Sequence, residues 1–329
     1  MMRILYAAPK YDYGDPARGY SYEHCNFYGT LERMGYDITY FDTLSLLREK
    51  GRPEMSRLLL DIARREKPDL LFSVLFRDEF EPEALWEISE NTQTATLNWF
   101  CDDQWRFENF TRHWAPFFNW SVTTTPSSLP KYQALGYSSV IKSQWACNHF
   151  AYRKPDLPLL HDVTFVGNPH SNRRKFIKKL AGYGLTVETW GANWGHGRID
   201  QEEMTALFGR SRINLNFSRT SIRNPERRFP FLWRPRRIYV YQVKGRVFEV
   251  PGCGGFLLTE AAEDLEHYYR PDKEIVVFRT LPELADKAAF YLKHETERNR
   301  IAEQGYRRTL AEHTYQKRFQ EIFRKIGLE

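Results

Sequence analysis

The chain has 329 residues, which exceeds one ordinary domain and suits two. Hydrophobic residues make up 42% of it, so each half can bury a core, and the 16% aromatic content is better explained by core packing than by stacking platforms for sugars or bases. The formal net charge is +6, no run approaches the ~20 apolar residues of a membrane-spanning helix, and the N-terminus lacks the apolar core of a signal peptide, so a cytoplasmic protein is expected.

In the first half, short apolar runs alternate with helical patterns. The helical pattern is clearest at 53–67, where apolar residues recur at helical spacing. The strand-like runs are 3–8, 37–41, 69–76, 94–100 and 121–125. Continuous apolar runs separated by helices are typical of a parallel sheet covered on both faces.

The second half repeats this alternation after a break. The proline-containing polar stretch 148–162 predicts an interdomain linker. Strand-like runs follow at 162–168, 185–191, 212–218, 254–259 and 274–278, and the C-terminal region is helical, ending in an amphipathic helix at 314–327. Two α/β halves predict two Rossmann-like domains, with ligands bound outside the carboxyl ends of the strands.

Basic residues gather in two runs, 173–179 and 223–237. Such runs attract nucleotide phosphates, nucleic acid or anionic lipid, and peripheral membrane contact therefore stays open. The four cysteines are far apart and form no Cys-x-x-Cys pair, which argues against a zinc ribbon, a redox dithiol or a disulfide framework.

The segment 244–260, KGRVFEVPGCGGFLLTE, carries the strongest chemical signal. A helical pattern with a basic start runs into a glycine turn and then an apolar strand. Arg246 and Glu249 are three residues apart, so on a helix they share a face and place a cation beside a hydroxyl acceptor. Glycines there let backbone N–H groups approach phosphate or sugar oxygens. A surface ion pair before an ordinary turn is the alternative.

The C-terminal half resembles a known family. The runs RVFEVPGCGGFLLTE and EIVVFRTLPELADKAAFYL and the ending AEHTYQKRF are similar to group 1 glycosyltransferases of the CgeB-like, spore-maturation type. The similarity covers 160–325 well and is looser before that, where it rests on NFYGTLERMGYDITYFD and WFCDD. It implies an α/β GT-B fold: two Rossmann-like domains, 1–155 (acceptor side) and 156–312 (nucleotide-sugar side), face a central cleft, and helix 313–329 crosses back to the first.

The resemblance also implies residue roles at the donor side. Glu249 matches the second Glu of the family's Glu-x7-Glu element, which holds donor-sugar hydroxyls, whereas Tyr241 stands where the first Glu is expected. Retention of anomeric configuration is therefore only weakly favoured over inversion. Arg246, with Lys244 as a second candidate, would neutralise the diphosphate. Gly254 and Gly255 match the turn at which the donor approaches backbone.

A second constellation lies at 164–180, where a predicted strand ends at Val166 and Gly167 forms the turn. The helix that follows begins near Ser171, with Ser171 or Asn172 as the cap. Arg173 and Arg174 fall in its first turn, where cations are unfavourable unless an anion is present. We expect one of the two arginines to bind phosphate. Candidates for contact with the donor sugar or base lie at this and other strand ends: Gly167, Asn193, Trp194, Asn216 and Ser218.

In the first half, Asp102 and Asp103 directly follow a predicted strand. Either carboxylate could orient or deprotonate an acceptor hydroxyl, and capping of the next helix is the alternative. His24 is a lesser candidate for the same role. Gly14 or Gly19, in the loop after the first strand, could approach the donor phosphates.

The sequence thus predicts metal-independent transfer of a sugar from a UDP- or GDP-linked donor to a glycan, glycolipid or glycoprotein. The adjacent aspartates are not an Asp-x-Asp motif, the histidines lack metal-ligand spacing, and no cofactor is expected beyond the nucleotide sugar. Two alternatives stay open. One is a glycosyltransferase that acts on a modified base in DNA, suggested by the 223–237 run. The other is a non-catalytic nucleotide-sugar-binding protein of the same fold, suggested by Tyr241.

Overall fold

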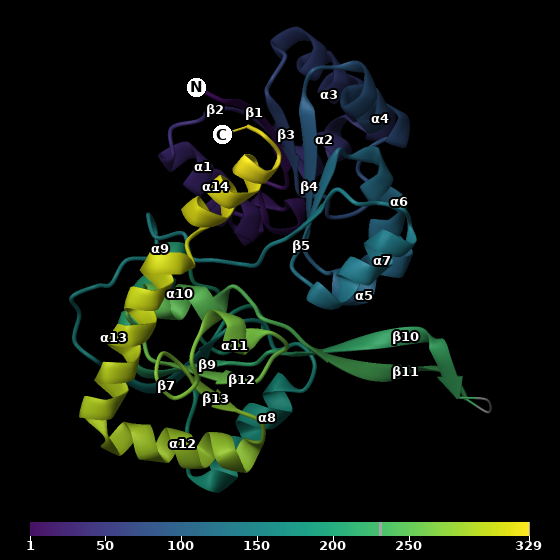
Figure 1. The fold of residues 1–329 in the computed structure, drawn as a ribbon. Coiled ribbons are helices and arrows are strands. Elements are labelled where there is room, and N and C mark those ends of the chain that lie inside the picture. Colours follow the sequence, from purple (N-terminus) through teal and green to yellow (C-terminus); the bar gives the residue numbers. More distant parts are fainter. Residues whose placement is uncertain (230–231, 329) are drawn as a thin grey trace. The chain divides into compact units, whose positions relative to one another are not determined.

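The computed structural model describes residues 1–229 and 232–328, with the side chains of 222–238 left outside the description. The chain divides into two compact units, each drawn in Figure 1. Unit 1 comprises Met1–Gln144 and Tyr315–Glu329, and unit 2 comprises Trp145–Thr314.

Unit 1 is built on a six-stranded sheet in which all paired strands are parallel, in the order β2-β1-β3-β4-β5-β6. The strands are β1 (Arg3–Ala8), β2 (Asp37–Asp42), β3 (Leu70–Ser73), β4 (Ala95–Phe100), β5 (Trp120–Thr123) and β6 (Val140–Lys142). The central strands β3 and β4 are almost wholly buried, as their continuous apolar runs predict.

Eight α-helices accompany this sheet in the described part of unit 1, besides short 3-10 and π helices. They are α1 (Gly29–Arg33), α2 (Thr43–Lys50), α3 (Arg52–Glu66), α4 (Pro82–Asn91), α5 (Asp103–Arg106), α6 (Arg112–Trp114), α7 (Leu129–Ala134) and α14 (Tyr315–Lys325). The last of these packs on the sheet through its aromatic face. Phe319 and Phe323 contact Phe72 of β3 with ring centroids 5.6 and 6.4 Å apart, and the hydroxyls of Tyr315 and Tyr22 are 2.9 Å apart.

Unit 2 contains a five-stranded parallel sheet in the order β13-β12-β9-β7-β8. Its strands are β7 (His161–Val166), β8 (Glu188–Trp190), β9 (Ser211–Asn216), β12 (Leu257–Glu260) and β13 (Val276–Phe278). Its helices are α8 (Arg173–Leu180), α9 (Gln201–Arg210), α10 (Arg246–Gly252), α11 (Leu265–Tyr268), α12 (Leu281–Lys293) and α13 (Glu295–Glu312). One apolar cluster of unit 2 joins α9, α10 and α11, and another joins α8 and α12 to the strands.

A two-stranded antiparallel hairpin interrupts unit 2 between β9 and α10. It consists of β10 (Arg219–Phe229) and β11 (Leu232–Tyr241), whose register runs from the Arg219–Tyr241 pair to the Phe229–Leu232 pair. Figure 1 shows its backbone extending away from the five-stranded sheet. The sequence indicated only a basic run here.

The division between the units differs from the predicted boundaries at 155/156 and 312/313. Residues 145–152, assigned from the sequence to the first domain, pack in unit 2: Cys147 and Tyr152 are buried in the cluster around α10. The Cys147 N–H donates to the His313 carbonyl over 2.9 Å, which ties this segment to the end of α13. The first residues of the predicted linker 148–162 are thus part of the folded core of unit 2 and do not act as a linker.

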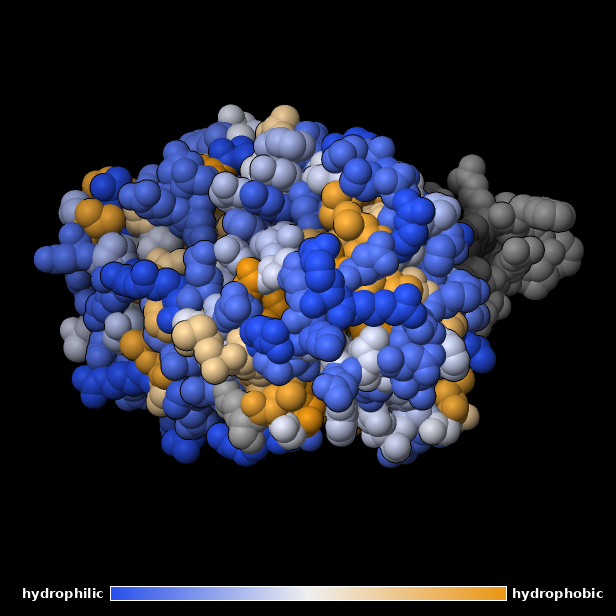
Figure 2. Space-filling model, turned by 90° about the horizontal axis from the view of Figure 1, so that it is seen from above, coloured by the Kyte–Doolittle hydropathy of each residue, from blue (hydrophilic) through white to orange (hydrophobic). Residues whose placement is uncertain are grey.

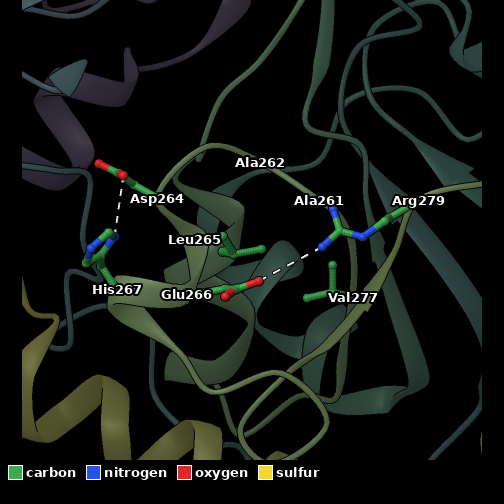
Figure 3. A pocket seen from close by; sticks show the side chains of 8 residues that line it. All are labelled: Ala261, Ala262, Asp264, Leu265, Glu266, His267, Val277 and Arg279. Atoms are coloured by element: carbon green, nitrogen blue, oxygen red, sulfur yellow. Dashed lines mark ion pairs between the residues drawn. The ribbon is translucent and has the colours of Figure 1, made fainter. Parts of the chain in front are cut away.

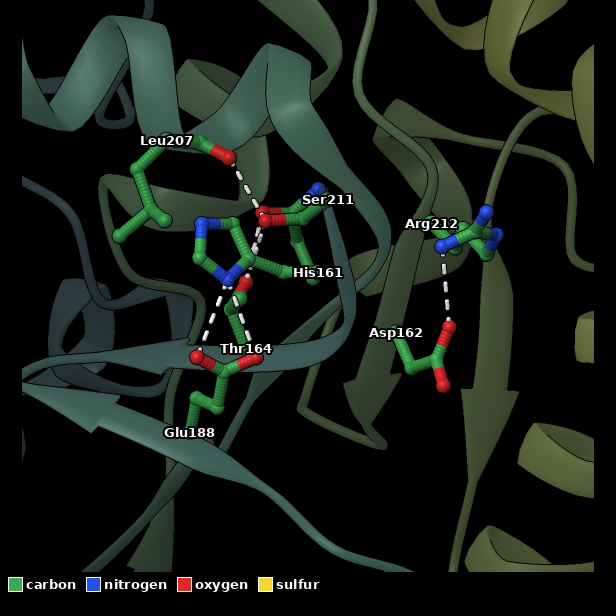
Figure 4. Close-up of polar contacts among 8 residues, drawn as sticks. His161, Asp162, Thr164, Glu188, Leu207, Ser211 and Arg212 are labelled. Atoms are coloured by element: carbon green, nitrogen blue, oxygen red, sulfur yellow. Dashed lines mark hydrogen bonds and ion pairs between the residues drawn. The ribbon is translucent and has the colours of Figure 1, made fainter. Parts of the chain in front are cut away.

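The amino-terminal edge of the unit 2 sheet is held by polar contacts (Figure 4). His161 of β7 lies 3.0 Å from both carboxylate oxygens of Glu188, and Arg212 pairs with Asp162 at 3.0 Å. These contacts join neighbouring strands at their starts. Because ligands of such sheets bind at the carboxyl ends, we assign this cluster to strand registration.

The face in Figure 2 is mainly hydrophilic, with apolar residues in small separate groups rather than in one continuous patch. Among the described helices, none has the length and apolar character needed to cross a membrane.

Candidate functional site

Two cations meet at the carboxyl ends of β7 and β9. Arg173, the first residue of α8, donates through Nη1 to the Asn168 carbonyl (2.8 Å) and through Nη2 to the Phe217 carbonyl (3.1 Å). Lys244 Nζ donates to the same Phe217 carbonyl (3.3 Å) and to Thr220 Oγ1 (3.1 Å). Residues 71 positions apart in the chain therefore converge on one carbonyl at the edge of the sheet.

Two further arginines and a carboxylate join this group. Burial lowers the pKa of Arg173 to about 10; the charge of Glu260 opposes that shift and the charge of Arg246 adds to it. Glu260, the last residue of β12, is 5% exposed and lies 3.9 Å from Arg219 Nε. We call Arg173, Arg219, Lys244 and Arg246 the cationic cluster. Its described side chains outnumber the nearby carboxylates Glu249 and Glu260, so the edge favours an anion.

Glu249 is the most deeply buried charged group of this edge. It is 0% exposed, and Arg246 donates to its Oε2 as the three-residue spacing predicted. Among the described residues, no partner donates to its second oxygen, Oε1. A buried carboxylate oxygen that lacks a donor is destabilising.

The glycine turn after α10 is explained by packing within unit 2. Gly254 has φ +70°, and a Cβ there would lie 2.8 Å from the side chain of Lys154. A Cβ on Gly255 would lie 2.9 Å from Asn214 Nδ2 and 3.0 Å from the Phe208 carbonyl. Both glycines are therefore required by the protein itself, and contact with a donor is not needed to account for them.

Arg174 does not join the cationic cluster in the described contacts. Its guanidinium donates to the Asn193 carbonyl and lies over the Trp194 ring, 5.1 Å from the centroid. Trp194 Nε1 in turn donates to the Gly167 carbonyl over 2.7 Å. These contacts fix the loop after β8 against the end of β7. Of the two arginines left open by the sequence, Arg173 therefore has the better position for phosphate.

The start of α8 differs from the prediction. Asn172 is the N-cap residue, but its side chain makes no capping hydrogen bond and instead donates to the Tyr239 hydroxyl over 3.2 Å. Ser171 adopts φ +60° and lies before the cap. The expected side-chain cap is thus wrong, because β11 offers Asn172 a competing partner.

Asn216 and Ser218 are buried at the end of β9 and are occupied by neighbours. Asn216 Nδ2 donates to Thr259 Oγ1 (2.9 Å), and Ser218 Oγ donates to the Glu260 carbonyl (2.7 Å). Both side chains join β9 to β12. We therefore assign these two side chains to holding β9 against β12 beneath the site rather than to direct contact with a ligand.

Asp103 was a candidate catalytic carboxylate, and the structure places it in the core of unit 1. It is 0% exposed, and its two oxygens accept from Thr111 Oγ1 (2.6 Å) and Tyr132 Oη (2.8 Å). Burial raises its pKa, and the charge of Asp102 adds to the rise. Because both oxygens are occupied and shielded from solvent, Asp103 is a positioning residue for α5 and α7.

Asp102 remains at the carboxyl end of β4, partly exposed and without a capping hydrogen bond from its side chain. A second carboxyl group lies near it. Burial raises the pKa of Glu23, and the charges of Asp12 and Asp102 raise it further. Glu23, the residue before His24, was not predicted as a site residue, because no motif surrounds it in the sequence.

His24 lies in an aromatic stack. Its ring centroid is 4.3 Å from that of Tyr20 and 5.0 Å from that of Tyr28, both in stacked orientation. Burial lowers its pKa, with a further contribution from Lys10. Stacking on both sides favours a structural role for His24 over that of an acceptor base.

The two glycines of the first loop differ. Gly14 (φ +73°) is enclosed: a Cβ would lie 2.7 Å from Leu44 Cβ, and its carbonyl accepts from Arg48 Nη2 over 2.5 Å. Gly19 (φ +80°) faces open space, since no described heavy atom lies within 4 Å of the position that a Cβ would take. Only Gly19 therefore leaves room for a ligand.

A cavity of 220 Å³ lies beside β12 and β13 (Figure 3). Two ion pairs border it: Asp264 with His267 at 3.4 Å, and Glu266 with Arg279 at 4.0 Å. Its volume is below the roughly 300–1,000 Å³ of typical ligand pockets, so we do not assign the donor to it. No group of three or more His, Cys, Asp or Glu side chains in the described part of the chain could hold a metal ion.

Comparison with known proteins agrees with this arrangement. Residues 173–324 match the family described as glycosyl transferase-like. Spore protein CgeB of Bacillus subtilis (strain 168) is 24% identical over 202 residues, which cover 56% of this chain and 60% of the length of CgeB. The predicted resemblance to CgeB-like glycosyltransferases is confirmed.

Solved structures establish the fold. Sucrose-phosphate synthase of Thermosynechococcus elongatus aligns with a TM-score of 0.66 at 10% identity, covering 99% of each chain. Anabaena HepE in complex with UDP and glucose aligns with a TM-score of 0.65 at 11% identity, covering 99% of this chain and 100% of its own. The catalytic domain of starch synthase IV from Arabidopsis thaliana gives 0.63 at 9% identity, covering 99% of each. The fold is GT-B, as predicted.

Proposed function

We propose that this protein is a glycosyltransferase whose nucleotide-sugar donor binds at the carboxyl edge of the unit 2 sheet. The observation that carries the proposal is the cationic cluster: Arg173 and Lys244 converge on the Phe217 carbonyl, with Arg246 close enough to affect the pKa of Arg173. Solved structures of the same fold are described in complex with UDP and glucose, UDP-glucose, or ADP and acarbose, which supports a nucleotide sugar as the donor.

In this proposal the cluster stabilises the departing diphosphate. Negative charge grows on the leaving group as the glycosidic bond to it breaks, and fixed cations favour that state over the ground state. One preorganised group of this kind is typically worth ~3 kcal/mol. Glu249 Oε1, which lacks a donor among the described residues, would accept a hydroxyl of the donor. Side-chain cations then supply the neutralising charge, so we propose transfer without a metal.

The acceptor hydroxyl would be positioned by unit 1. Asp102 and Glu23, rather than Asp103, would orient or deprotonate the acceptor hydroxyl, since Asp102 is partly exposed at a strand end and Glu23 lies near it. We further propose that the acceptor is a glycan, glycolipid or glycoprotein and that the donor is linked to UDP or GDP. Retention of the anomeric configuration is weakly favoured over inversion, and the protein is proposed to be cytoplasmic.

The DNA-directed alternative depends on the basic run 223–237, whose side chains lie outside the described residues. The described backbone places residues 223–229 and 232–237 of this run in the β10–β11 hairpin, which begins three residues after the end of β9. A DNA-directed enzyme would bind duplex DNA with a steep dependence on salt, which a glycan-directed enzyme would not show. The non-catalytic alternative predicts donor binding without turnover or donor hydrolysis.

A donor screen tests the proposal. Thermal shift and calorimetry with UDP-, GDP-, CMP- and dTDP-sugars would be run on wild type, Lys244→Met and the matched control Lys178→Met, an exposed lysine of α8. We expect one nucleotide family to stabilise wild type and the control, and Lys244→Met to lose about tenfold in affinity. Equal binding by wild type and both variants would exclude the cluster as the donor site. Repeating the wild-type measurement and a turnover assay with EDTA tests metal independence.

A further inference from the structure

Exposed aromatic rings gather at the carboxyl edge of the unit 1 sheet. Tyr13, in the loop after β1, is 52% exposed, and Phe76, in the loop after β3, is 39% exposed. The two rings meet edge to face with centroids 5.3 Å apart and an interplanar angle of 87°. Residues 63 positions apart in the chain thus form what we call the aromatic corner, in which the Tyr13 ring is the floor and the Phe76 ring is the wall.

The loop that presents Tyr13 is held rigidly. The Asp12 N–H donates to the Gly19 carbonyl (3.0 Å), Ser21 Oγ donates to the Pro9 carbonyl (2.5 Å), and the Gly14 carbonyl is also held by a side-chain donor. Tyr13 itself adopts φ +54°, a left-handed conformation that costs a non-glycine residue roughly 1–2 kcal/mol. The contacts of the loop maintain this conformation, so the exposed ring is preorganised.

A polar rim accompanies the corner. The Arg18 guanidinium lies 4.5 Å from the Tyr13 ring centroid, and its Nε is 3.4 Å from Asp12 Oδ2. A cation that bridges a ring and a carboxylate leaves oxygen and nitrogen atoms beside an apolar surface. This combination matches the chemistry of a sugar ring, which has an apolar C–H face and a hydroxyl rim.

The charge of this edge decides between a neutral and an anionic ligand. In the segments that follow β1, β3 and β4, carboxyl groups that are not fully buried outnumber such cations; the carboxyl groups are Asp12, Asp15, Glu23, Asp78, Glu81 and Asp102, and the cations are Lys10, Arg18, Arg77 and Arg106. A phosphate polymer such as nucleic acid would be repelled here, whereas carboxylates accept hydrogen bonds from sugar hydroxyls.

We propose that the aromatic corner of Tyr13 and Phe76 binds a neutral sugar ring of the acceptor, which makes the acceptor a carbohydrate. The inference rests on the proposed function, because it assigns the acceptor of that same reaction. The Arg18 guanidinium lies over one face of the Tyr13 ring, so the C–H face of the sugar would stack on the opposite face, and Phe76 limits its orientation.

The test uses substitutions that preserve the loop. Tyr13→Asn removes the ring while keeping a residue that tolerates positive φ, Tyr13→Phe keeps the ring, and Phe76→Ser removes the wall. Trp86→Ala is the matched control, since Trp86 is an equally exposed aromatic residue (50%) on helix α4. Calorimetry with maltotriose, cellotriose and chitotriose, in the presence and absence of UDP, measures binding. A single-stranded DNA oligonucleotide serves as the anionic probe, and UDP alone reports on the donor site.

We expect one of the oligosaccharides to bind wild type, with affinity about tenfold lower in Tyr13→Asn and Phe76→Ser and unchanged in Tyr13→Phe and Trp86→Ala. Melting temperature and UDP affinity should be the same in all five proteins. The inference is overturned if no oligosaccharide binds wild type, if binding ignores both ring-removing substitutions, or if these substitutions abolish DNA binding instead. Failure of the oligosaccharides alongside intact UDP binding rejects the corner and leaves the donor assignment standing; loss of UDP binding as well rejects the proposed function.

Discussion

Substitution of Arg246 by methionine should destabilise unit 2 strongly, because the buried carboxylate of Glu249 would lose the cation that pairs with it. That carboxylate is 0% exposed, one of its oxygens has no donor among the described residues, and Arg246 donates to the other. Breaking a buried ion pair from one side costs ~3–5 kcal/mol. The Arg246 side chain is 26% exposed, so the lower end of that range, ~3 kcal/mol, is expected.

A double-mutant cycle separates this cost from general loss of packing. Glu249→Leu alone should cost less than Arg246→Met, since the remaining guanidinium can reach solvent, and the double variant should recover most of the loss. Urea denaturation followed by tryptophan fluorescence measures each free energy of unfolding. Arg300→Met is the matched control: Arg300 and Glu297 have the same three-residue spacing but are both exposed, so stability should not change. A cost below ~1 kcal/mol for Arg246→Met, or no recovery in the double variant, would refute the reasoning.

Three further predictions concern stability. Burial raises the pKa of Glu79 from 4.5 to about 7, so the folded protein loses stability as pH rises through that interval. The free energy of unfolding of Glu79→Gln should exceed that of wild type by about 2–3 kcal/mol at pH 8 and match it near pH 4.5. If urea unfolding gives the same pH dependence for both proteins, this prediction is wrong. Asp103→Asn should cost ~1–3 kcal/mol because Thr111 and Tyr132 lose a charged acceptor, with UDP affinity unchanged by calorimetry. Gly305→Ala should cost ~1–3 kcal/mol, because its Cβ would meet the Glu274 carbonyl, whereas Gly182→Ala, with open space, should be neutral in thermal unfolding.

The parallel sheets were predictable because burial on both faces leaves continuous apolar runs in the sequence. The runs at 94–100 and 212–218 correspond to β4 and β9, and the strand ends then locate the polar residues that follow. The Arg246–Glu249 pair was also predictable, since it depends only on helical spacing. Local pattern thus determines these features.

The β10–β11 hairpin was not predictable from the same rules. Prolines and dense charge in 219–241 do not match a strand pattern, because Pro cannot donate in the interior of a sheet. A two-stranded ribbon has only edges, so Pro is tolerated there, and Pro235 takes part in the register opposite Arg228. Strand propensity depends on the position of the strand in the sheet, which sequence alone does not report.

The burial of Asp103 was hidden for a different reason. Its hydroxyl donors stand 8 and 29 residues away, at Thr111 and Tyr132, and no local pattern connects them. Likewise, Arg173 and Arg174 are equivalent by position in the sequence. The helix turns their side chains in different directions, so that one meets the ends of β7 and β9 and the other meets Trp194.

The contrast between the two sheet edges follows from side chains rather than from the fold. In both units the strands are parallel and helices begin at the carboxyl edge, so backbone dipoles make both edges favourable to anions. In unit 2, Arg173, Lys244 and Arg246 reinforce that preference. In unit 1, carboxylates such as Asp12 and Asp102 oppose it, and their charges add to the rise that burial causes in the pKa of Glu23. One architecture used twice therefore provides an edge suited to an anionic ligand and another suited to a neutral one rich in hydroxyls, which is the division of roles that the proposed function assigns to the two units.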